Sequence, residues 1–305
     1  MSWGRGRFGG VITAMITPFA PDGSLDLDAA ADLGRWLVAH GNEALVVAGT
    51  TGEGSVLTDQ EKTDLWRAVS EAVTVPVIAN AGSNDTAHSV EMTKAAAKAG
   101  VAGILAVTPY YNRPSQTGLL AHFAAIASAA SDHGPGSAGL PVMIYDIPVR
   151  TGRKVALATM VELVQKCPNV VAVKDATGDP VASARLVAEM PAQFDLYSGD
   201  SALTLPLLAV GGAGVVGVAS HWTGSQHGQM LSAFWAGDVE RACHINAGLL
   251  ASFDFEGSEQ WPNPIPAKAV MRALGLAVGQ CRLPMGPASA ALDTAARSLL
   301  AGVAY

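Results

Sequence analysis

Residues 170–177 read VVAVKDAT, a run of small and β-branched apolar residues that contains a lysine. Such a run is typical of a strand buried on both faces, as parallel sheets require. Because burying an ammonium group is costly, Lys174 is expected to be neutral or matched to a partner. A neutral buried amine is what Schiff-base chemistry on a carbonyl substrate requires. The alternatives are an ion pair with the adjacent Asp175 and a lysine stem that reaches out to solvent.

Lys174 is the one lysine that the pattern places inside the core. The remaining six occur in stretches predicted to be helix or loop surface: Lys62, Lys94, Lys98, Lys154, Lys166 and Lys268.

Apolar runs alternate with amphipathic stretches along most of the chain. Eight strand-like runs cover residues 11–18, 44–49, 76–82, 103–109, 141–148, 170–177, 195–201 and 214–220. Helical periodicity falls between them at residues 28–40, 58–72, 86–99, 116–131, 156–167 and 180–190. Thr58 and Glu61 have the spacing of a helix capping box. The alternation predicts an α/β fold, a (βα)8 TIM barrel. A doubly wound open sheet is the competing architecture, but no glycine-rich phosphate loop follows the first run.

The pattern becomes purely helical from about residue 225, with a proline-rich break at residues 261–266 (WPNPIP). We therefore predict two domains, a catalytic barrel over residues 1–224 and a C-terminal helical domain over residues 225–305. A glycine- and serine-rich stretch at residues 131–139 is predicted to be a surface loop.

Charge and cysteine content exclude several classes of protein. The net charge of −7, without a basic patch, argues against a nucleic-acid partner. Three cysteines at irregular spacing form neither a disulfide framework nor a metal motif, which fits a reducing compartment. We find no signal peptide and no apolar run long enough to span a membrane. The expected location is the cytoplasm.

In such barrels, catalytic groups lie at the carboxyl ends of the strands. Hydroxyl groups in a glycine-flanked turn can hold a carboxylate, an arginine can clamp one, and phenols can transfer protons. Together with a reactive amine, such groups suit a 2-oxo acid substrate. Each also has a structural explanation, as a capping turn, a packed tyrosine or a surface arginine. The residues at these ends are Thr50, Thr51, Tyr110, Tyr111, Tyr145, Arg150 and Gly199.

Seven motifs then follow one another over nearly the whole chain: GTTGE, TPYYNRP, YDIPVRTG, VKDATGD, YSGD, GGAGVVGV and NPIPAK. The ordered set resembles the dihydrodipicolinate synthase / N-acetylneuraminate lyase family of pyruvate-dependent aldolases. The resemblance implies a barrel with a C-terminal helical domain, usually a homotetramer built as a dimer of tight dimers. It implies neither a cofactor nor a metal, because the substrate forms an imine with the enzyme.

The resemblance also implies catalytic roles. Lys174 would form the Schiff base with C2 of pyruvate, and loss of a C3 proton would give an enamine that attacks an aldehyde. Tyr145 would shuttle protons. Thr51 and Tyr111 would be its relay partners, with Tyr111 reaching the neighbouring subunit's site.

The implied binding residues surround the same site. Thr50 and Thr51 would hold the pyruvate carboxylate, and Gly199 and Val216 would line the pocket. Arg150 would bind the carboxylate of aspartate semialdehyde. This arginine favours condensation of pyruvate with aspartate semialdehyde, in lysine and diaminopimelate biosynthesis.

Other functions stay open at this point. One is an aldolase or dehydratase acting on a 2-keto-3-deoxy sugar acid, and another is a lyase of the N-acetylneuraminate type. A non-catalytic 2-oxo acid sensor would be expected to lose one of the catalytic residues, and none is lost. A purely structural oligomer has no feature in its favour.

Several positions depart from the family pattern. Lysine-inhibited members carry two histidines and a glutamate where Asp59, Lys62 and His88 align, although Asn84 and Tyr110 remain. We therefore predict weak or absent inhibition by lysine. Three further departures have no role that the sequence assigns: Gly54 replaces a serine that is common after GTTGE, Asp146 replaces a common asparagine, and His221 stands where an asparagine is frequent.

Overall fold

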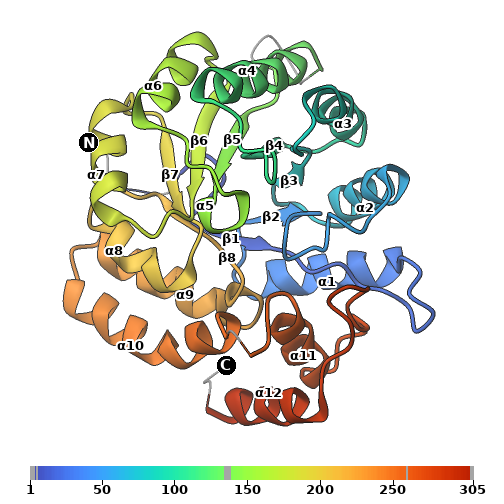
Figure 1. The fold of residues 1–305 in the computed structure, drawn as a ribbon. Coiled ribbons are helices and arrows are strands. Elements are labelled where there is room, and N and C mark those ends of the chain that lie inside the picture. The colour runs from blue at the N-terminus through green and yellow to red at the C-terminus, as the bar shows by residue number, and fades with distance from the viewer. Residues whose placement is uncertain (1–3, 5, 134–138, 259, 303–305) are drawn as a thin grey trace.

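The protein is described here by a computed structural model that covers residues 4, 6–133, 139–258 and 260–302. Eight parallel strands close into a barrel in sequence order, from β1 to β8 (Figure 1). This confirms the predicted (βα)8 architecture. Each strand is shorter than the apolar run that contains it, because the last residues of the run leave the sheet for the following loop. The strands are β1 (Val11–Ala14), β2 (Ala44–Val47), β3 (Val77–Asn80), β4 (Gly103–Val107), β5 (Val142–Asp146), β6 (Val170–Asp175), β7 (Asp195–Ser198) and β8 (Gly214–Gly217).

Helices surround the barrel (Figure 1). The six predicted from periodicity are present, with ends close to the predicted positions: α1 (Leu27–Ala39), α2 (Asp59–Ala72), α3 (Thr86–Lys98), α4 (Gln116–His133), α6 (Leu157–Lys166) and α7 (Pro180–Glu189). Three short helical elements were not predicted, because each is too short to show a helical pattern of apolar residues. They are α5 (Pro148–Thr151), η1 (Ser201–Leu203) and α8 (Thr204–Leu208). Helix α4 runs past the predicted start of the loop at residue 131, and residues 134–138 lie outside the described residues.

The predicted capping box at the start of α2 is confirmed. The Thr58 hydroxyl accepts from the Glu61 N–H at 3.2 Å, and the Glu61 carboxylate accepts from the Thr58 N–H at 2.8 Å. The same carboxylate pairs with Arg282 at 2.6 Å. The cap thus also fastens the C-terminal part of the chain to α2.

Two apolar layers make up the core. Inside the barrel, alternate residues of the strands pack together, with Ile12, Val46, Ile78 and Leu105 among them. Phe8 and Tyr197 belong to this cluster, and the Tyr197 hydroxyl accepts from the Phe8 N–H at 3.2 Å near the amino end of the barrel.

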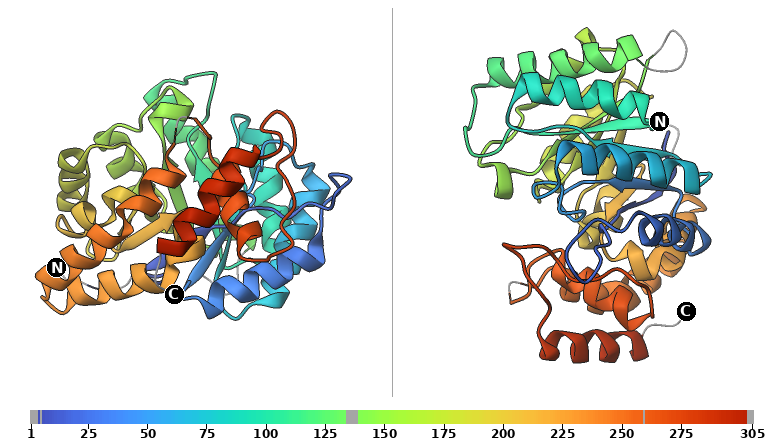
Figure 2. Two further views of the ribbon diagram at one scale, coloured as in Figure 1. Left: turned by 90° about the horizontal axis from the view of Figure 1, so that it is seen from below. Right: turned by 90° about the vertical axis from the view of Figure 1, so that its right-hand side faces the viewer.

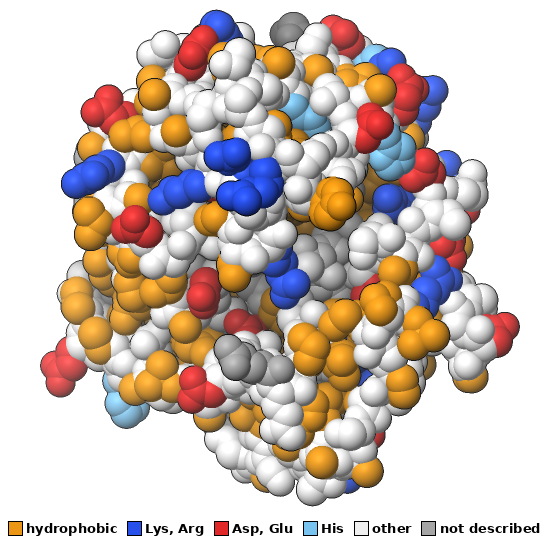
Figure 3. Space-filling view, viewed as in Figure 1, with side chains coloured by type: hydrophobic (Ala, Val, Ile, Leu, Met, Phe, Trp, Pro, Cys, Tyr) orange, Lys and Arg blue, Asp and Glu red, His pale blue; other side chains and the backbone are white. Residues whose placement is uncertain are grey.

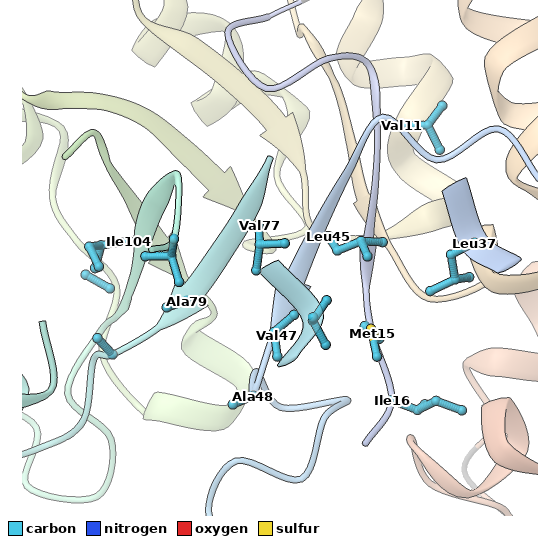
Figure 4. Packing of buried hydrophobic residues seen from close by; sticks show 14 of the residues in the cluster. Val11, Met15, Ile16, Leu37, Leu45, Val47, Ala48, Val77, Ala79 and Ile104 are labelled. Carbon is cyan, nitrogen blue, oxygen red and sulfur yellow. The ribbon is translucent and has the colours of Figure 1, made fainter. Parts of the chain in front are cut away.

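Outside the barrel, the other alternate strand residues pack against the helices. Figure 4 shows Leu45 of β2 between Val77 of β3 and Leu37 of α1. A fully buried side chain of this size stabilises the fold by about 1.5–3 kcal/mol. This layer holds the strand ends, and hence the site, in fixed positions.

The C-terminal helices form a further layer beside the barrel (Figure 2). They are α10 (Val239–Glu256), α11 (Ile265–Ala273) and α12 (Ala290–Gly302). The helix before them, α9 (Ser220–Trp235), packs against β1 and covers the barrel. The predicted division after residue 224 therefore falls within α9, next to its non-helical residue Thr223. In the described part of the chain, no helix has the length and apolar character needed to cross a membrane.

Lys268 corrects the sequence-based expectation that only one lysine is internal. Its side chain is fully buried and pairs with Glu53 at 2.7 Å. Lys268 lies on the buried face of α11, and Glu53 of the GTTGE turn supplies the carboxylate that compensates its charge. The sequence pattern around Lys268 gave no sign of either contact.

Candidate active site

Lys174 and Tyr145 lie side by side at the carboxyl end of the barrel. They are register partners on β6 and β5, and Lys174 Nζ lies 4.3 Å from the centroid of the Tyr145 ring. Both side chains are buried, with Lys174 only 5% exposed. The strand pairing therefore places an amine and a phenol at the same point of the barrel interior.

The Lys174 amine has a pKa lowered to about 7, chiefly because burial disfavours the ammonium form. Glu256 opposes this shift and Arg150 adds to it. At neutral pH a large fraction of the amine is consequently neutral and nucleophilic.

The alternative of a Lys174–Asp175 ion pair does not hold. Side chains alternate along a strand, so Asp175 faces the helices while Lys174 faces the interior. The Asp175 carboxylate instead accepts from the Thr177 N–H at 2.9 Å and from the Ser183 hydroxyl at 2.6 Å.

Lys268 shows what a buried structural lysine looks like in the same protein. It has a carboxylate at 2.7 Å, and its Nζ also donates to the Gln280 carbonyl at 2.9 Å. Lys174 has no such ion pair among the described residues. This difference marks Lys174, and not Lys268, as the amine left available to a substrate.

The two threonines of GTTGE have different partners. The Thr50 side chain interacts with Tyr145 and opposes the rise in the pKa of that phenol. The Thr51 hydroxyl accepts from Asn263 Nδ2 at 3.0 Å, and Asn263 belongs to the segment that precedes α11. Burial raises the pKa of Tyr145 to about 12, so the phenol is protonated and can donate.

The tightness of this turn explains the departure at Gly54. Its N–H donates to the Gly49 carbonyl at 3.0 Å, and a Cβ atom at position 54 would lie 2.1 Å from the Ala48 carbonyl oxygen. A serine at position 54 would therefore require a different turn. The departure at His221 also has a structural explanation, since its Nε2 accepts from the Ile16 N–H at 3.1 Å and ties α9 to the end of β1.

A cavity of about 520 Å³ adjoins this group. Thr50, Tyr110 and Arg150 line it, while Lys174 and Tyr145 do not. Thr50 therefore connects the cavity to the amine and the phenol. Figure 3 shows a hollow at the middle of this face, with Lys and Arg side chains gathered along one side of it.

The remaining predicted site residues are Gly199, Val216 and Tyr111, and their surroundings differ. Gly199 follows β7, and a Cβ there would lie 2.7 Å from Ala176 Cβ, so only glycine fits without displacement. Val216 is buried in the barrel interior on β8. Tyr111 is 90% exposed, at a φ of +73°, and is not directed into this chain's own barrel.

Sequence reasoning missed Glu256, at the end of α10. One of its carboxylate oxygens is buried with no hydrogen-bond partner among the described residues. Burial raises its pKa to about 8, and Ser201, Asp200 and Lys174 are among the groups that interact with it. No motif marks this position, because the contact depends on how α10 returns to the barrel. Among the described residues, no cluster of His, Cys, Asp and Glu has the makings of a metal site.

These features define a (βα)8-barrel protein with a buried lysine amine at the carboxyl end of the barrel. Comparison with known sequences gives the particular family, since the dihydrodipicolinate synthetase family matches residues 7–302. The chain belongs to this family.

Relatives resemble the chain over nearly its full length. A 4-hydroxy-tetrahydrodipicolinate synthase from Acidothermus cellulolyticus is 48% identical over 93% of this chain and 88% of its own. Among solved structures, a dihydrodipicolinate synthase from Cyanidioschyzon merolae with lysine bound is 44% identical, with a TM-score of 0.92 over 98% of this chain and 99% of the other. The Acinetobacter baumannii enzyme complexed with pyruvate is 32% identical, with a TM-score of 0.89 over 97% of this chain and 98% of the other.

Proposed function

We infer that the protein is a 4-hydroxy-tetrahydrodipicolinate synthase, a lyase of the Schiff-base (class I) aldolase type. It condenses pyruvate with aspartate semialdehyde in lysine and diaminopimelate biosynthesis, in the cytoplasm. The observation that carries this inference is the buried Lys174 amine, which lies beside Tyr145 and makes no ion pair within the part of the chain that the structure describes. The names of the relatives and the pyruvate complex of one of them support the same reaction.

The chemistry follows from the two neighbouring groups. The neutral Lys174 amine adds to C2 of pyruvate, and protonation of the adduct's hydroxyl group with loss of water gives the iminium ion. The iminium ion acidifies the C3 protons, and removal of one gives the enamine, whose C3 attacks the aldehyde carbon. Tyr145, with its protonated phenol, supplies and accepts protons during these steps.

A direct assay tests the assignment. Purified protein is given pyruvate with aspartate semialdehyde, and separately 2-keto-3-deoxygluconate or N-acetylneuraminate. Turnover of the first pair alone is expected. Cleavage or dehydration of a sugar acid at a comparable rate would instead favour a sugar-acid enzyme of the same fold.

We propose that Thr50, and not Thr51, is the immediate relay partner of Tyr145. The Thr50 contact with Tyr145 supports this order, while Thr51 is held by Asn263. Thr50→Val is expected to slow imine formation roughly 10- to 100-fold, because the phenol loses its proton path. Thr51→Val is expected to raise the KM for pyruvate more than it slows imine formation. If Thr51→Val instead slowed imine formation and Thr50→Val mainly raised the KM for pyruvate, Thr51 would be the immediate relay partner of Tyr145.

We propose that Tyr111 completes the site of a neighbouring subunit in a homotetramer. Its exposure and its left-handed backbone conformation support this, since such a conformation in a bulky residue is uncommon without a constraint. Sedimentation velocity on the active enzyme tests the assembly, and full activity in a monomer would contradict it.

Lysine is expected to inhibit weakly or not at all. Asp59, Lys62 and His88 line the cavity together with Asn84 and Tyr110. The Asp59 carboxylate already contacts His88 Nε2 at 2.9 Å and Lys62 Nζ at 3.8 Å. An incoming lysine ammonium would therefore meet the like charge of Lys62 beside a carboxylate that is already shared. Initial rates across millimolar lysine measure this, and strong inhibition would show that the cavity accepts lysine in another way.

The pH dependence of imine formation should report the Lys174 amine. Because its pKa is about 7, trapping of the pyruvate imine by borohydride should rise between pH 6 and pH 8. Ionised Glu256 raises the pKa of the Lys174 amine, and because the pKa of Glu256 is itself about 8, this effect is present mainly at the upper end of that range. Glu256→Gln should therefore move the profile to lower pH. Glu240→Gln, at an exposed position on the same helix, is the matched control. An unchanged profile in Glu256→Gln would show that the two groups are not coupled.

A further inference from the structure

The GTTGE turn, which carries Thr50 and Thr51, is only partly fixed by the barrel itself. The Thr17 hydroxyl donates to the Gly52 carbonyl at 2.6 Å, and this bond holds the middle of the turn to the end of β1. Within the turn, the Glu53 N–H donates to the Thr50 carbonyl at 3.1 Å. These bonds involve the backbone of the turn, so the placement of its last residue depends on what holds the Glu53 side chain.

The backbone of this turn adopts a conformation that needs support from its surroundings. Ala48, immediately before the turn, has a φ of +60°, and Glu53, at its end, has a φ of +53°. Left-handed backbone is uncommon for residues other than glycine, asparagine and aspartate. Such residues keep this conformation when the surrounding structure constrains them strongly. The contacts of Glu53 therefore matter for the shape of the whole turn.

Those contacts come from the C-terminal region. Lys268 Nζ on α11 lies 2.7 Å from Glu53 Oε1, and the Arg282 N–H donates to Glu53 Oε2 at 2.8 Å. Asn263, just before α11, donates to the Thr51 hydroxyl at 3.0 Å. One face of the turn thus rests on the barrel, while the C-terminal region holds its side chains.

The Lys268–Glu53 pair is fully enclosed. The side chains are 0% and 2% exposed, respectively. The Lys268 amine also donates to the Gln280 carbonyl at 2.9 Å and lies 4.2 Å from the centroid of the Phe19 ring. A buried ion pair is often no more stabilising than apolar side chains of similar volume, because both charges lose their hydration. Its value here is better explained by geometry, since both ends of the Glu53 carboxylate are held in one orientation.

We propose that Lys268 and Glu53 are positioning residues for pyruvate. Their ion pair holds the GTTGE turn so that Thr50 and Thr51 can bind the carboxylate of the substrate. Both residues act through the turn and not by contact with pyruvate. The inference rests on the function proposed above, because it assumes that this turn binds pyruvate.

Borohydride trapping of the pyruvate imine on the full-length protein, over a range of pyruvate concentrations, tests this role. Lys268→Met removes the ammonium group and keeps a side chain of similar length. The half-saturating pyruvate concentration is expected to rise at least about tenfold, because a displaced turn binds the carboxylate poorly. The trapping rate at saturating pyruvate should change less than about threefold, and its pH profile should stay the same, since Lys174 and Tyr145 are unaltered.

Arg272→Gln is the matched control. Arg272 also lies on α11, but its ion pair with Asp293 at 2.7 Å joins α11 to α12 and not to the turn. General loosening of the C-terminal helices would affect both variants. Only Lys268→Met should raise the half-saturating pyruvate concentration, whereas both variants should lower the Tm.

A double variant keeps the test decisive if Lys268→Met does not fold. Glu53→Gln combined with Lys268→Met leaves no unpaired buried charge, and it still lacks the ion pair. Its half-saturating pyruvate concentration should also exceed that of the wild type at least about fivefold.

Two results would overturn the proposal. One is a wild-type half-saturating concentration in Lys268→Met or in the double variant, even with a lowered Tm, which would leave the pair a purely structural role. The other is an equal rise in Arg272→Gln. Absence of any trapped adduct in the wild-type protein would be a different outcome, because it would refute the proposed function and this inference with it.

Discussion

Replacement of Lys174 by alanine is expected to lower kcat by at least about 10³-fold and to abolish the borohydride-trapped lactyl adduct. The reason is the position of its amine in the interior of the barrel, beside Tyr145 and without an ion-pair partner among the described residues. No other amine in the described structure shares that position. Mass analysis of peptides after treatment with pyruvate and borohydride locates the adduct, and steady-state assays measure the loss of turnover.

Two lysines serve as controls for this experiment. Lys166→Ala, on the exposed surface of α6, should leave both readouts unchanged. Lys268 should carry no adduct in the wild-type protein, because Glu53 and the Gln280 carbonyl hold its amine. An adduct that persists in Lys174→Ala, or one found on Lys268, would refute the proposed nucleophile.

Replacement of Arg150 by alanine is expected to separate the two substrates. Arg150 lies on α5 at the exposed edge of the larger cavity, where its guanidinium can pair with the carboxylate of the aldehyde. Loss of a charged hydrogen bond of about 1.5–3 kcal/mol corresponds to roughly a 10- to 100-fold fall in kcat/KM for aspartate semialdehyde. Imine trapping with pyruvate alone should change little.

A small secondary effect on the amine accompanies this substitution. Arg150 contributes to lowering the Lys174 pKa, so its removal should shift the imine-formation profile slightly toward higher pH. Arg67→Ala, an exposed arginine on α2 that contacts Asp64, is the control and should alter neither substrate. Equal losses for pyruvate trapping and for aldehyde use would contradict the assignment of Arg150 to the aldehyde.

The sequence by itself determined the barrel and the burial of Lys174 in its sixth strand. The pattern VVAVKD predicts a strand buried on both faces, whereas the contacts of Asp175 with Thr177 and Ser183 were needed to exclude an ion pair with Lys174. Capping at Thr58 and the spacing of the apolar runs likewise depend on neighbouring residues, which is why they can be read from sequence.

Only the tertiary structure decided which distant residues meet. Barrel closure and the return of the C-terminal helices bring Asn263 to Thr51, Lys268 to Glu53 and Glu256 toward Lys174. Each pair is far apart in the sequence, and local periodicity carries no information about such contacts. The register between β5 and β6 likewise sets Asp146 beside Asp175 behind the catalytic pair. Strand pairing is a contact between segments, so this juxtaposition became visible only once the chain was folded.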